Sequence, residues 1–201
     1  MPSPAKIAVF ISGGGTNLQS LIDAAGDGRL SAKIMLVISS RSDAFGLERA
    51  RREGIDTFVF KSKDYASSED AELKLLGILD KYSIDFIALA GYLKMIPLSL
   101  IRKYKYRITN IHPALLPKYG GKGMYGHFVH EAVIASGDRE SGATVHLVDE
   151  IYDHGKILKQ ERAPVLPGDT PESLAERILH IEHKIYPIAL ENLIRGKLSD
   201  G

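Results

Sequence analysis

Residues 6–17 read KIAVFISGGGTN, and this stretch decides the fold class. Its first part, Lys6–Ile11, is an apolar run with branched side chains, typical of a strand buried on both faces of a parallel sheet. Three glycines then open a turn, and apolar residues recur at helical spacing from Leu18 until Gly26 and Gly28 end the pattern. The stretch therefore predicts a strand, a glycine-rich loop and the beginning of a helix.

The glycine-rich loop is a candidate anion site. At such a helix start, unpaired backbone N–H groups and the helix dipole favour a negative ligand, most often phosphate. A dinucleotide-binding loop would have a third glycine where this chain has Leu18, and an acid after the second strand where it has Ser39-Ser40-Arg41. The Lys-Ser/Thr pair of a triphosphate loop is absent as well. A site for a single phosphate group remains, and a merely tight turn is the alternative.

Strand and helix patterns alternate through the first half of the chain. The sequence predicts strands at Ile34–Ile38, Thr57–Phe60 and Phe86–Ala90, and helices at Ala44–Arg52, Ser68–Tyr82 and Ser99–Lys103. Such alternation is characteristic of α/β proteins with right-handed crossovers. We expect a Rossmann-like, mostly parallel central sheet flanked by helices.

The second half adds a hairpin and a long helix. Alternating residues at Gly142–Val148 and Lys156–Ala163 predict a β-hairpin. Thr170 begins a long final helix, whose expected core stripe is Leu174, Ile178, Ile181, Ile185 and Ile188. With 201 residues and 44% hydrophobic content, we expect a single domain, 1–201, with an N-terminal half of about 1–100 and a C-terminal half of about 101–201.

Composition disfavours several classes of function. The formal net charge is +1, so basic groups such as Arg49, Arg51 and Arg52 are interpreted as solvated helix faces. There is no cysteine, which fits a reducing compartment, and the apolar run Ile7–Ile11 is far too short to span a membrane. We expect a soluble, cytoplasmic protein that binds neither nucleic acid nor membrane.

The segment Thr109–Pro117 carries the strongest candidates for chemistry. The preceding residues from Tyr106 predict a strand, so Asn110 and His112 project from one face of it, and Pro113 ends it. An amide N–H suits a developing oxyanion, and imidazole gains or loses a proton near neutral pH. Together they suit acyl-type transfer, whereas the alternative is a turn with incidental polar groups.

Two loops are further candidates. Gly91–Pro97 follows the strand that ends at Ala90, at the sheet edge where α/β proteins bind ligands, so its apolar residues suit a flat aromatic ligand. A packed connection into the next helix is equally compatible with the sequence. The glycine-rich stretch 118–126 predicts a mobile surface loop.

Histidines and acids elsewhere have mainly structural interpretations. His127 and His130 could share a metal, but no acid or cysteine cluster accompanies them, so they are interpreted as polar residues at a helix start. The acids of Asp149–Gly155 are expected to face solvent unless a partner such as His112 makes one of them catalytic. Glu182 falls on the edge of the final helix's apolar stripe, where a ligand hydroxyl or a basic residue would be its partner.

Taken together, the chain resembles the folate-dependent glycinamide ribonucleotide formyltransferases over nearly its full length. The resemblance rests on four segments: the glycine loop Ile11–Leu18, the segment Asn110–Pro117, the hairpin Gly142–Gly155 and the helical stretch Glu182–Pro187. The second and third of these segments occur across the wider formyltransferase superfamily. The glycine loop is the segment that points to glycinamide ribonucleotide as the substrate within that superfamily.

The resemblance implies transfer of a formyl group from 10-formyltetrahydrofolate, a co-substrate, to the amine of glycinamide ribonucleotide in purine synthesis, without a metal. Asn110 would bind the formyl oxygen, protonated His112 would add charge and a proton, and Asp153 would raise the pKa of His112. Thr144 and His146 would support this group. The ribonucleotide would be bound by Gly14, Gly15, Thr16, Asn17, Pro113 and Glu182, and the folate by Leu93, Lys94, Met95, Ile96, Asn110, Asp149, Ile151 and Asp153.

Two departures from the family pattern stand out. Ser68 aligns where an arginine often faces the folate's glutamate tail, so recognition of that tail differs or falls to Lys63. The loop Gly120–Gly126 is longer than in the pattern. A monomer or a homodimer is expected.

Three rival functions are formylation of another amine, hydrolysis of the folate, and phosphate binding without chemistry. The first two usually need an additional C-terminal or N-terminal domain, for which we expect no room in this chain.

Overall fold

The computed structural model describes residues 3–197. The chain forms two compact units, Met1–Ile108 and Thr109–Gly201, which are described separately. The boundary between them falls a few residues after the expected division near residue 100. That the two units act as a single domain stays a prediction.

The first unit is built on four parallel strands in the order β3-β2-β1-β4. They are β1 (Ala5–Ile11), β2 (Ala32–Ser39), β3 (Asp56–Val59) and β4 (Phe86–Leu89). Val9 of β1 pairs with Val37 on one side and Ala88 on the other, and Ile7–Ile11 are fully buried. The prediction of a strand buried on both faces is confirmed, because β1 is central in this group.

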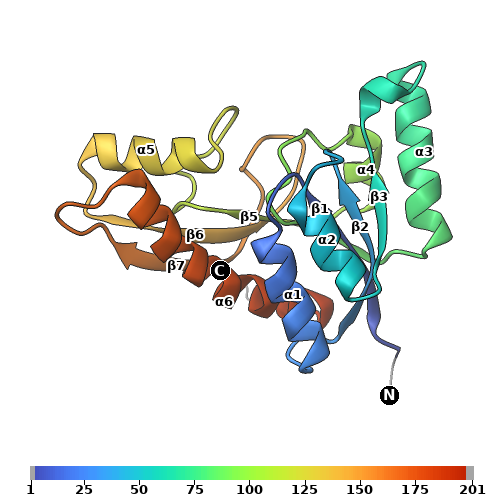
Figure 1. Ribbon diagram of the computed structural model, residues 1–201, viewed down its shortest axis with the longest axis horizontal. Coiled ribbons are helices and arrows are strands. Elements are labelled where there is room, and N and C mark those ends of the chain that lie inside the picture. Colours follow the sequence, from blue (N-terminus) through green and yellow to red (C-terminus); the bar gives the residue numbers. More distant parts are fainter. Residues whose placement is uncertain (1–2, 198–201) are drawn as a thin grey trace. The chain divides into compact units, whose positions relative to one another are not determined.

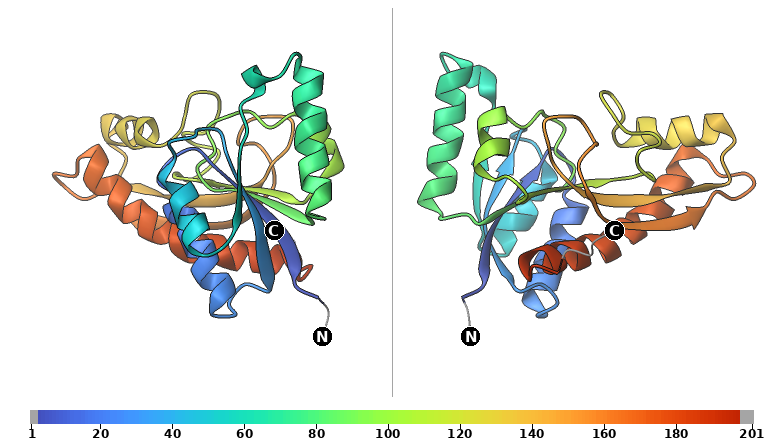
Figure 2. Two further views of the ribbon diagram at one scale, coloured as in Figure 1. Left: turned by 45° about the vertical axis from the view of Figure 1, so that its right-hand side comes forward. Right: turned by 180° about the vertical axis from the view of Figure 1, so that it is seen from behind.

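Helices cover both faces of these strands (Figures 1 and 2). On one face lie α1 (Thr16–Gly26) and α2 (Phe45–Arg52); on the other lie α3 (Ser68–Lys81) and α4 (Leu98–Lys103), with the short 3-10 helix η1 (Ser62–Asp64) beside α3. Ser67 caps α3 by accepting a hydrogen bond from the backbone N–H of Asp70. The arrangement is that of right-handed crossovers between parallel strands.

The second unit contains antiparallel strands. β5 (Ile108–His112), β6 (Glu140–Leu147) and β7 (Ile157–Pro164) are neighbours in that order, and Asn110 pairs with His146 while His112 pairs with Thr144. β5 begins two residues later than expected. The reason is a turn, in which Tyr106 has a positive φ of 61° and the N–H of Arg107 donates to the carbonyl of Tyr104.

Two helices complete this unit. α6 (Pro171–Ile194) packs along β6 and β7, and its first turns lie beside α5 (His127–Ser136) (Figure 1). Thr170 caps α6 through a reciprocal pair of bonds with Ser173, as expected of a helix start. Within residues 3–197, no helix combines the length and the apolar character needed to cross a membrane.

The expected core stripe of α6 is correct at its beginning and wrong at its end. Leu174, Ile178 and Ile185 are buried, but Ile188 is 42% exposed. The buried face shifts by one position along the helix, because the buried residues Glu182, Tyr186, Ala189 and Leu193 repeat at spacings of three and four. Ile188 therefore ends on the outer side.

Candidate active site

The glycine loop of the first unit leads directly into the start of helix α1. β1 ends at Ile11, and Gly15 starts α1 with a left-handed φ of 72°, without a side-chain cap. The first N–H groups of a helix have no partner in the backbone of that helix, and this favours an anion at such a helix start. The structure thus places the predicted residues Gly14 to Asn17 together at a helix start.

Ser12 connects this loop to the segment after β4, a contact that the sequence did not reveal. Its buried hydroxyl accepts a hydrogen bond of 2.9 Å from the N–H of Leu93 and lies 2.7 Å from the hydroxyl of Ser40. Either of the two hydroxyl groups can be the donor in the bond between Ser12 and Ser40. In the same segment Ile96 is buried, whereas Leu93 and Met95 expose apolar surface, Met95 to 67%.

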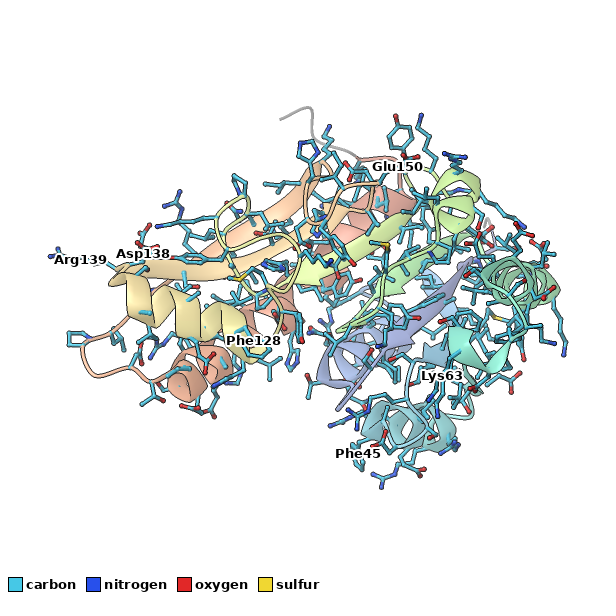
Figure 3. All side chains as sticks on the ribbon, turned by 90° about the horizontal axis from the view of Figure 1, so that it is seen from above. Phe45, Lys63, Phe128, Asp138, Arg139 and Glu150 are labelled. Carbon is cyan, nitrogen blue, oxygen red and sulfur yellow. The ribbon has the colours of Figure 1, made fainter. Side chains whose placement is uncertain are left out.

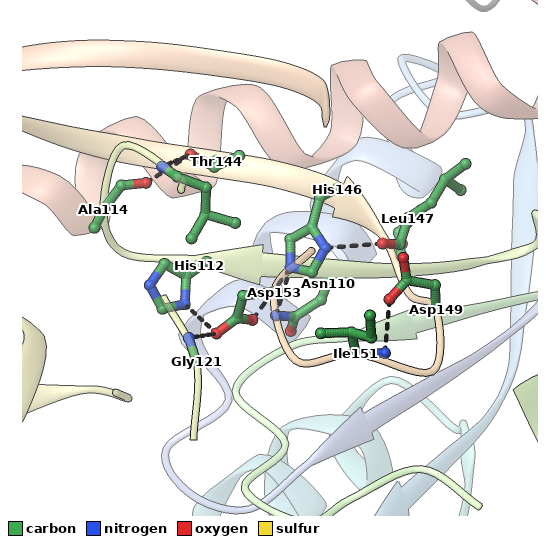
Figure 4. Close-up of polar contacts among 12 residues, drawn as sticks. Asn110, His112, Ala114, Gly121, Thr144, His146, Leu147, Asp149, Ile151 and Asp153 are labelled. Carbon is green, nitrogen blue, oxygen red and sulfur yellow. Dashed lines mark hydrogen bonds and ion pairs between the residues drawn. The ribbon is translucent and has the colours of Figure 1, made fainter. Parts of the chain in front are cut away.

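In the second unit, four polar side chains meet at β5, β6 and the hairpin loop (Figure 4). Asn110 and His112 come from β5, His146 from β6 and Asp153 from the loop that joins β6 to β7. Asp153 lies between the two histidines, with its carboxylate 3.7 Å from Nδ1 of His112 and 3.5 Å from Nε2 of His146. The sequence predicted that Asp153 would meet His112, and the structure brings them together.

The hydrogen bonds of His146 orient Asn110. Nδ1 of His146 lies 2.8 Å from the carbonyl of Leu147, so we assign the proton of the neutral ring to this nitrogen. Nε2 then accepts a bond of 3.1 Å from the amide nitrogen of Asn110. An amide NH₂ has two N–H donors. The second donor of Asn110 is therefore directed by a buried neighbour and can serve an oxyanion.

His112 has a partner at each nitrogen. It is 3% exposed, and Nε2 donates to the carbonyl of Tyr119 at 2.8 Å, which leaves Nδ1 facing Asp153. Burial lowers the pKa of His112 below its usual value, and the opposing effect of the Asp153 carboxylate is smaller. Asp153 thus acts on the pKa of His112 in the expected direction, but desolvation of the charged ring has the larger effect.

Asp153 is held in its ionised form. Burial alone would raise its pKa, but the nearby rings of His146 and His112 and the hydrogen bond from the N–H of Gly121 together bring the pKa below its usual value. The Gly121 bond is 2.9 Å long. Residues Tyr119 and Gly121 of the expected surface loop thus contribute two backbone groups to this cluster.

Thr144 holds the segment that follows His112. Its buried hydroxyl accepts from the N–H of Leu116 and donates to the carbonyl of Ala114 (Figure 4). Gln160 of β7 donates to the same hydroxyl at 2.8 Å and to the carbonyl of Leu116 at 3.1 Å. Gln160 was not predicted, because a glutamine on a strand carries no sign of its long-range contact.

Other predicted residues lie outside this cluster. Asp149 accepts from the N–H of Ile151 and pairs with His154 at 3.4 Å, and the side chain of Ile151 is exposed. Glu182 is buried on α6, as its position at the stripe edge indicated. Lys63 lies exposed on η1 in the first unit (Figure 3).

Of the two histidines of α5, His127 lies at the helix start as expected and His130 does not match its expected role. His127 pairs with Glu131 at 2.9 Å, but His130 is buried rather than a polar residue at the surface. Burial and the nearby His127 and His112 lower its pKa to about 4. Among residues 3–197, no group of three or more His, Cys, Asp or Glu side chains is placed to hold a metal ion.

Comparison with known proteins identifies the family of this chain. Residues 5–190 match the family described as formyl transferase, so the chain belongs to that family.

Several relatives of this chain are phosphoribosylglycinamide formyltransferases. The chain is 48% identical to phosphoribosylglycinamide formyltransferase, chloroplastic, of Arabidopsis thaliana over 92% of its length, and 40% identical to phosphoribosylglycinamide formyltransferase of Haemophilus influenzae over 96%, covering 89% of that protein. It spans less than two thirds of the length of the plant relatives, 64% for Arabidopsis thaliana and 62% for Vigna unguiculata.

Solved structures show the same fold. Glycinamide ribonucleotide transformylase 1 from Symbiobacterium toebii is 39% identical and has a TM-score of 0.91, covering 98% of this chain and 90% of that one. Phosphoribosylglycinamide formyltransferase from Brucella melitensis is 44% identical, with a TM-score of 0.87 and coverage of 94% and 95%. The predicted fold class, a mostly parallel sheet with flanking helices, a C-terminal hairpin and a long final helix, is confirmed.

Proposed function

We propose that this protein transfers the formyl group of 10-formyltetrahydrofolate to the amine of glycinamide ribonucleotide, in purine biosynthesis. The observation that carries the proposal is the contact of Asp153 with both His112 and His146, together with the hydrogen bond from Asn110 to Nε2 of the same His146. The names of the relatives support the same acceptor. An amide donor, an imidazole and an ionised carboxylate are the groups that formyl transfer needs.

The reaction moves the formyl carbon from the folate nitrogen to the amine nitrogen, and a proton moves in the opposite direction. The amine nitrogen attacks the formyl carbon, and the carbonyl oxygen becomes an oxyanion that the second amide N–H of Asn110 stabilises. The C–N bond to the folate then breaks, and the folate nitrogen gains the proton that the amine loses. Nδ1 of neutral His112 is the basic atom that can carry this proton, because the carboxylate of Asp153 stabilises the resulting imidazolium.

A second role of His112, donation of its Nε2–H to the formyl oxygen, requires a change of partner. In the structure Nε2 donates to the carbonyl of Tyr119, so that nitrogen can reach a formyl oxygen only after the carbonyl moves. We therefore expect substrate binding to displace the segment Tyr119–Gly121.

Substrate recognition is divided among the other predicted residues. The backbone of Gly14 to Asn17 would bind the ribonucleotide phosphate, since α1 begins there without a capping side chain. Glu182 would bind the ribose hydroxyls. The exposed apolar residues Leu93 and Met95, together with the hairpin loop, would contact the pterin.

The deciding test mixes the protein with 10-formyltetrahydrofolate and glycinamide ribonucleotide. Folate absorbance and the mass of the ribonucleotide are followed together, and a formyl gain that needs both substrates is the expected result. Formate release without the ribonucleotide would instead indicate a hydrolase, a class with which this chain shares its fold through a formyltetrahydrofolate deformylase that is 21% identical. Binding without turnover would favour another acceptor amine or a binding protein.

A further inference from the structure

Two carbonyl groups of the glycine loop are held by the neighbouring helix α2. The backbone N–H of Gly46 donates to the carbonyl of Gly13 at 3.0 Å. Nε of Arg49 donates to the carbonyl of Gly14 at 2.9 Å. The sequence indicated that Arg49 belongs to a solvated helix face, but its side chain is bonded to the backbone of the glycine loop.

These two bonds fix the direction of the N–H groups in the loop. A trans peptide is planar, so the C=O of one residue and the N–H of the next point in opposite directions. With the carbonyls of Gly13 and Gly14 turned toward α2, the N–H groups of Gly14 and Gly15 point away from it. Those two N–H groups directly precede the start of α1, where an anion would bind.

The side chain of Arg49 is itself held in place. Its guanidinium lies 5.2 Å from the ring centre of Phe45, which Figure 3 labels, and Nη1 lies 3.4 Å from the side-chain oxygen of Gln19. The helix also approaches the loop closely at Gly46, where an added Cβ would lie 2.5 Å from Cδ1 of Ile11. The contact between α2 and the loop is thus tight as well as hydrogen-bonded.

We propose that Arg49 is a positioning residue for the acceptor's phosphate group: it holds the Gly14–Gly15 peptide so that its N–H faces the anion. The inference rests on the proposed function, because it assigns the phosphate of the ribonucleotide to this loop. Arg49 acts here through the direction of a peptide plane, and its guanidinium need not touch the ligand.

The test compares Arg49→Gln with a matched control on the same helix, Arg52→Gln. Arg52 also lies near Phe45, at 5.7 Å, and its loss removes the same charge. We expect Arg49→Gln to raise the KM for glycinamide ribonucleotide about tenfold, the scale of one lost hydrogen bond, with kcat and the folate KM unchanged. Arg52→Gln should leave all three values unchanged.

A charge-preserving variant separates positioning from simple attraction. Lysine lacks the planar fork of arginine, so Arg49→Lys should keep most of the defect. A lysine variant that behaves like the original protein, or equal defects at Arg49 and Arg52, would overturn the proposal in favour of a general electrostatic effect.

A binding readout keeps the inference testable even if formyl transfer fails. Amide NMR shifts of Gly14 and Gly15 are followed while inorganic phosphate is added. We expect both amides to shift in the original protein and in Arg52→Gln, and to respond at about tenfold higher phosphate in Arg49→Gln. Absence of a response in the original protein would overturn the assignment of phosphate to this loop.

Discussion

Asn110 is oriented by a buried neighbour and keeps a second N–H group for the role that we propose. One amide N–H is used by Nε2 of His146, and that acceptor is fixed because the other nitrogen of the ring donates to the carbonyl of Leu147. The remaining N–H is therefore directed before any substrate arrives. Such preorganised donors contribute strongly to catalysis, since they need no reorientation during the reaction.

We expect Asn110→Ala to lower kcat by about 10²-fold or more, the usual effect of losing one oxyanion donor. The binding of both substrates and the melting temperature should change little. Asn192→Ala, the same change at an exposed position of α6, is the control and should be neutral. Undiminished turnover in Asn110→Ala would show that another group stabilises the oxyanion.

His112 makes a pH-dependent prediction with a definite sign. Its pKa is lowered by burial and partly restored by Asp153, so the ring is neutral at pH 7 and charges only below its usual pKa. A base that must be neutral gives a kcat/KM that rises with pH through this lowered pKa and then stays level. NMR titration of the His112 ring should give a midpoint below 6.5, the ordinary value for histidine.

Removing the carboxylate should move that midpoint further down. Asp153→Asn takes away the group that favours the charged ring, so the His112 midpoint should fall in this variant. Asp149→Asn is the matched control, because Asp149 pairs with His154 instead, and it should leave the midpoint unchanged. A midpoint that rises in Asp153→Asn would contradict the arrangement.

At the scale of elements, local sequence patterns predicted most helices and strands, because each follows from nearby residues. The apolar run of β1 and the start of α6 at Thr170 are both short-range signals, and both are confirmed. The errors occur where tertiary contacts, and not nearby residues, determine which side chains are buried and where an element begins. Ile188 lies exposed because the buried stripe of α6 shifts, and β5 starts late because of the turn at Tyr106.

The active-site elements show the same division. Asn110 and His112 could be identified from their spacing, and Asp153 only through the resemblance to a known family. Ser12, Tyr119 and Gln160 could not be predicted, because each acts through a contact with a residue at least seven positions away. Tyr119 contributes a backbone carbonyl, which any residue could supply, so its identity carries no signal for that role.

α5 makes a prediction about stability. His130 is buried with its Nδ1 unpartnered, and its pKa is lowered to about 4, whereas an unfolded chain titrates near the ordinary value of 6.5. Between these pH values the unfolded chain binds more protons, so the free energy of unfolding falls as the pH falls through this window. The loss is roughly 2 to 3 kcal/mol for a shift of this size.

His130→Phe should remove this part of the pH dependence. Unfolding by denaturant at several pH values from 4 to 7 should give a flatter profile for the variant than for the original protein. His180→Phe, at an exposed position of α6, is the control and should keep the original slope. Parallel profiles for all three proteins would show that His130 does not titrate with a lowered pKa.

For the whole molecule, the fate of the formyl group distinguishes a transferase from a hydrolase of the same fold. An amine that is bound and oriented beside the formyl carbon can have an effective concentration of about 10⁵ M or more, so it should outcompete water as the nucleophile. We expect formate to be a minor product, roughly 1% or less, when glycinamide ribonucleotide is saturating. Weaker recognition of the acceptor phosphate, as proposed for Arg49→Gln, should raise the formate fraction at low ribonucleotide concentration but not at saturation, and Arg52→Gln should raise it at neither. Quantifying formate and formylated ribonucleotide in the same reactions tests this partition; a large formate fraction at saturation would show that the acceptor amine does not control access to the formyl carbon.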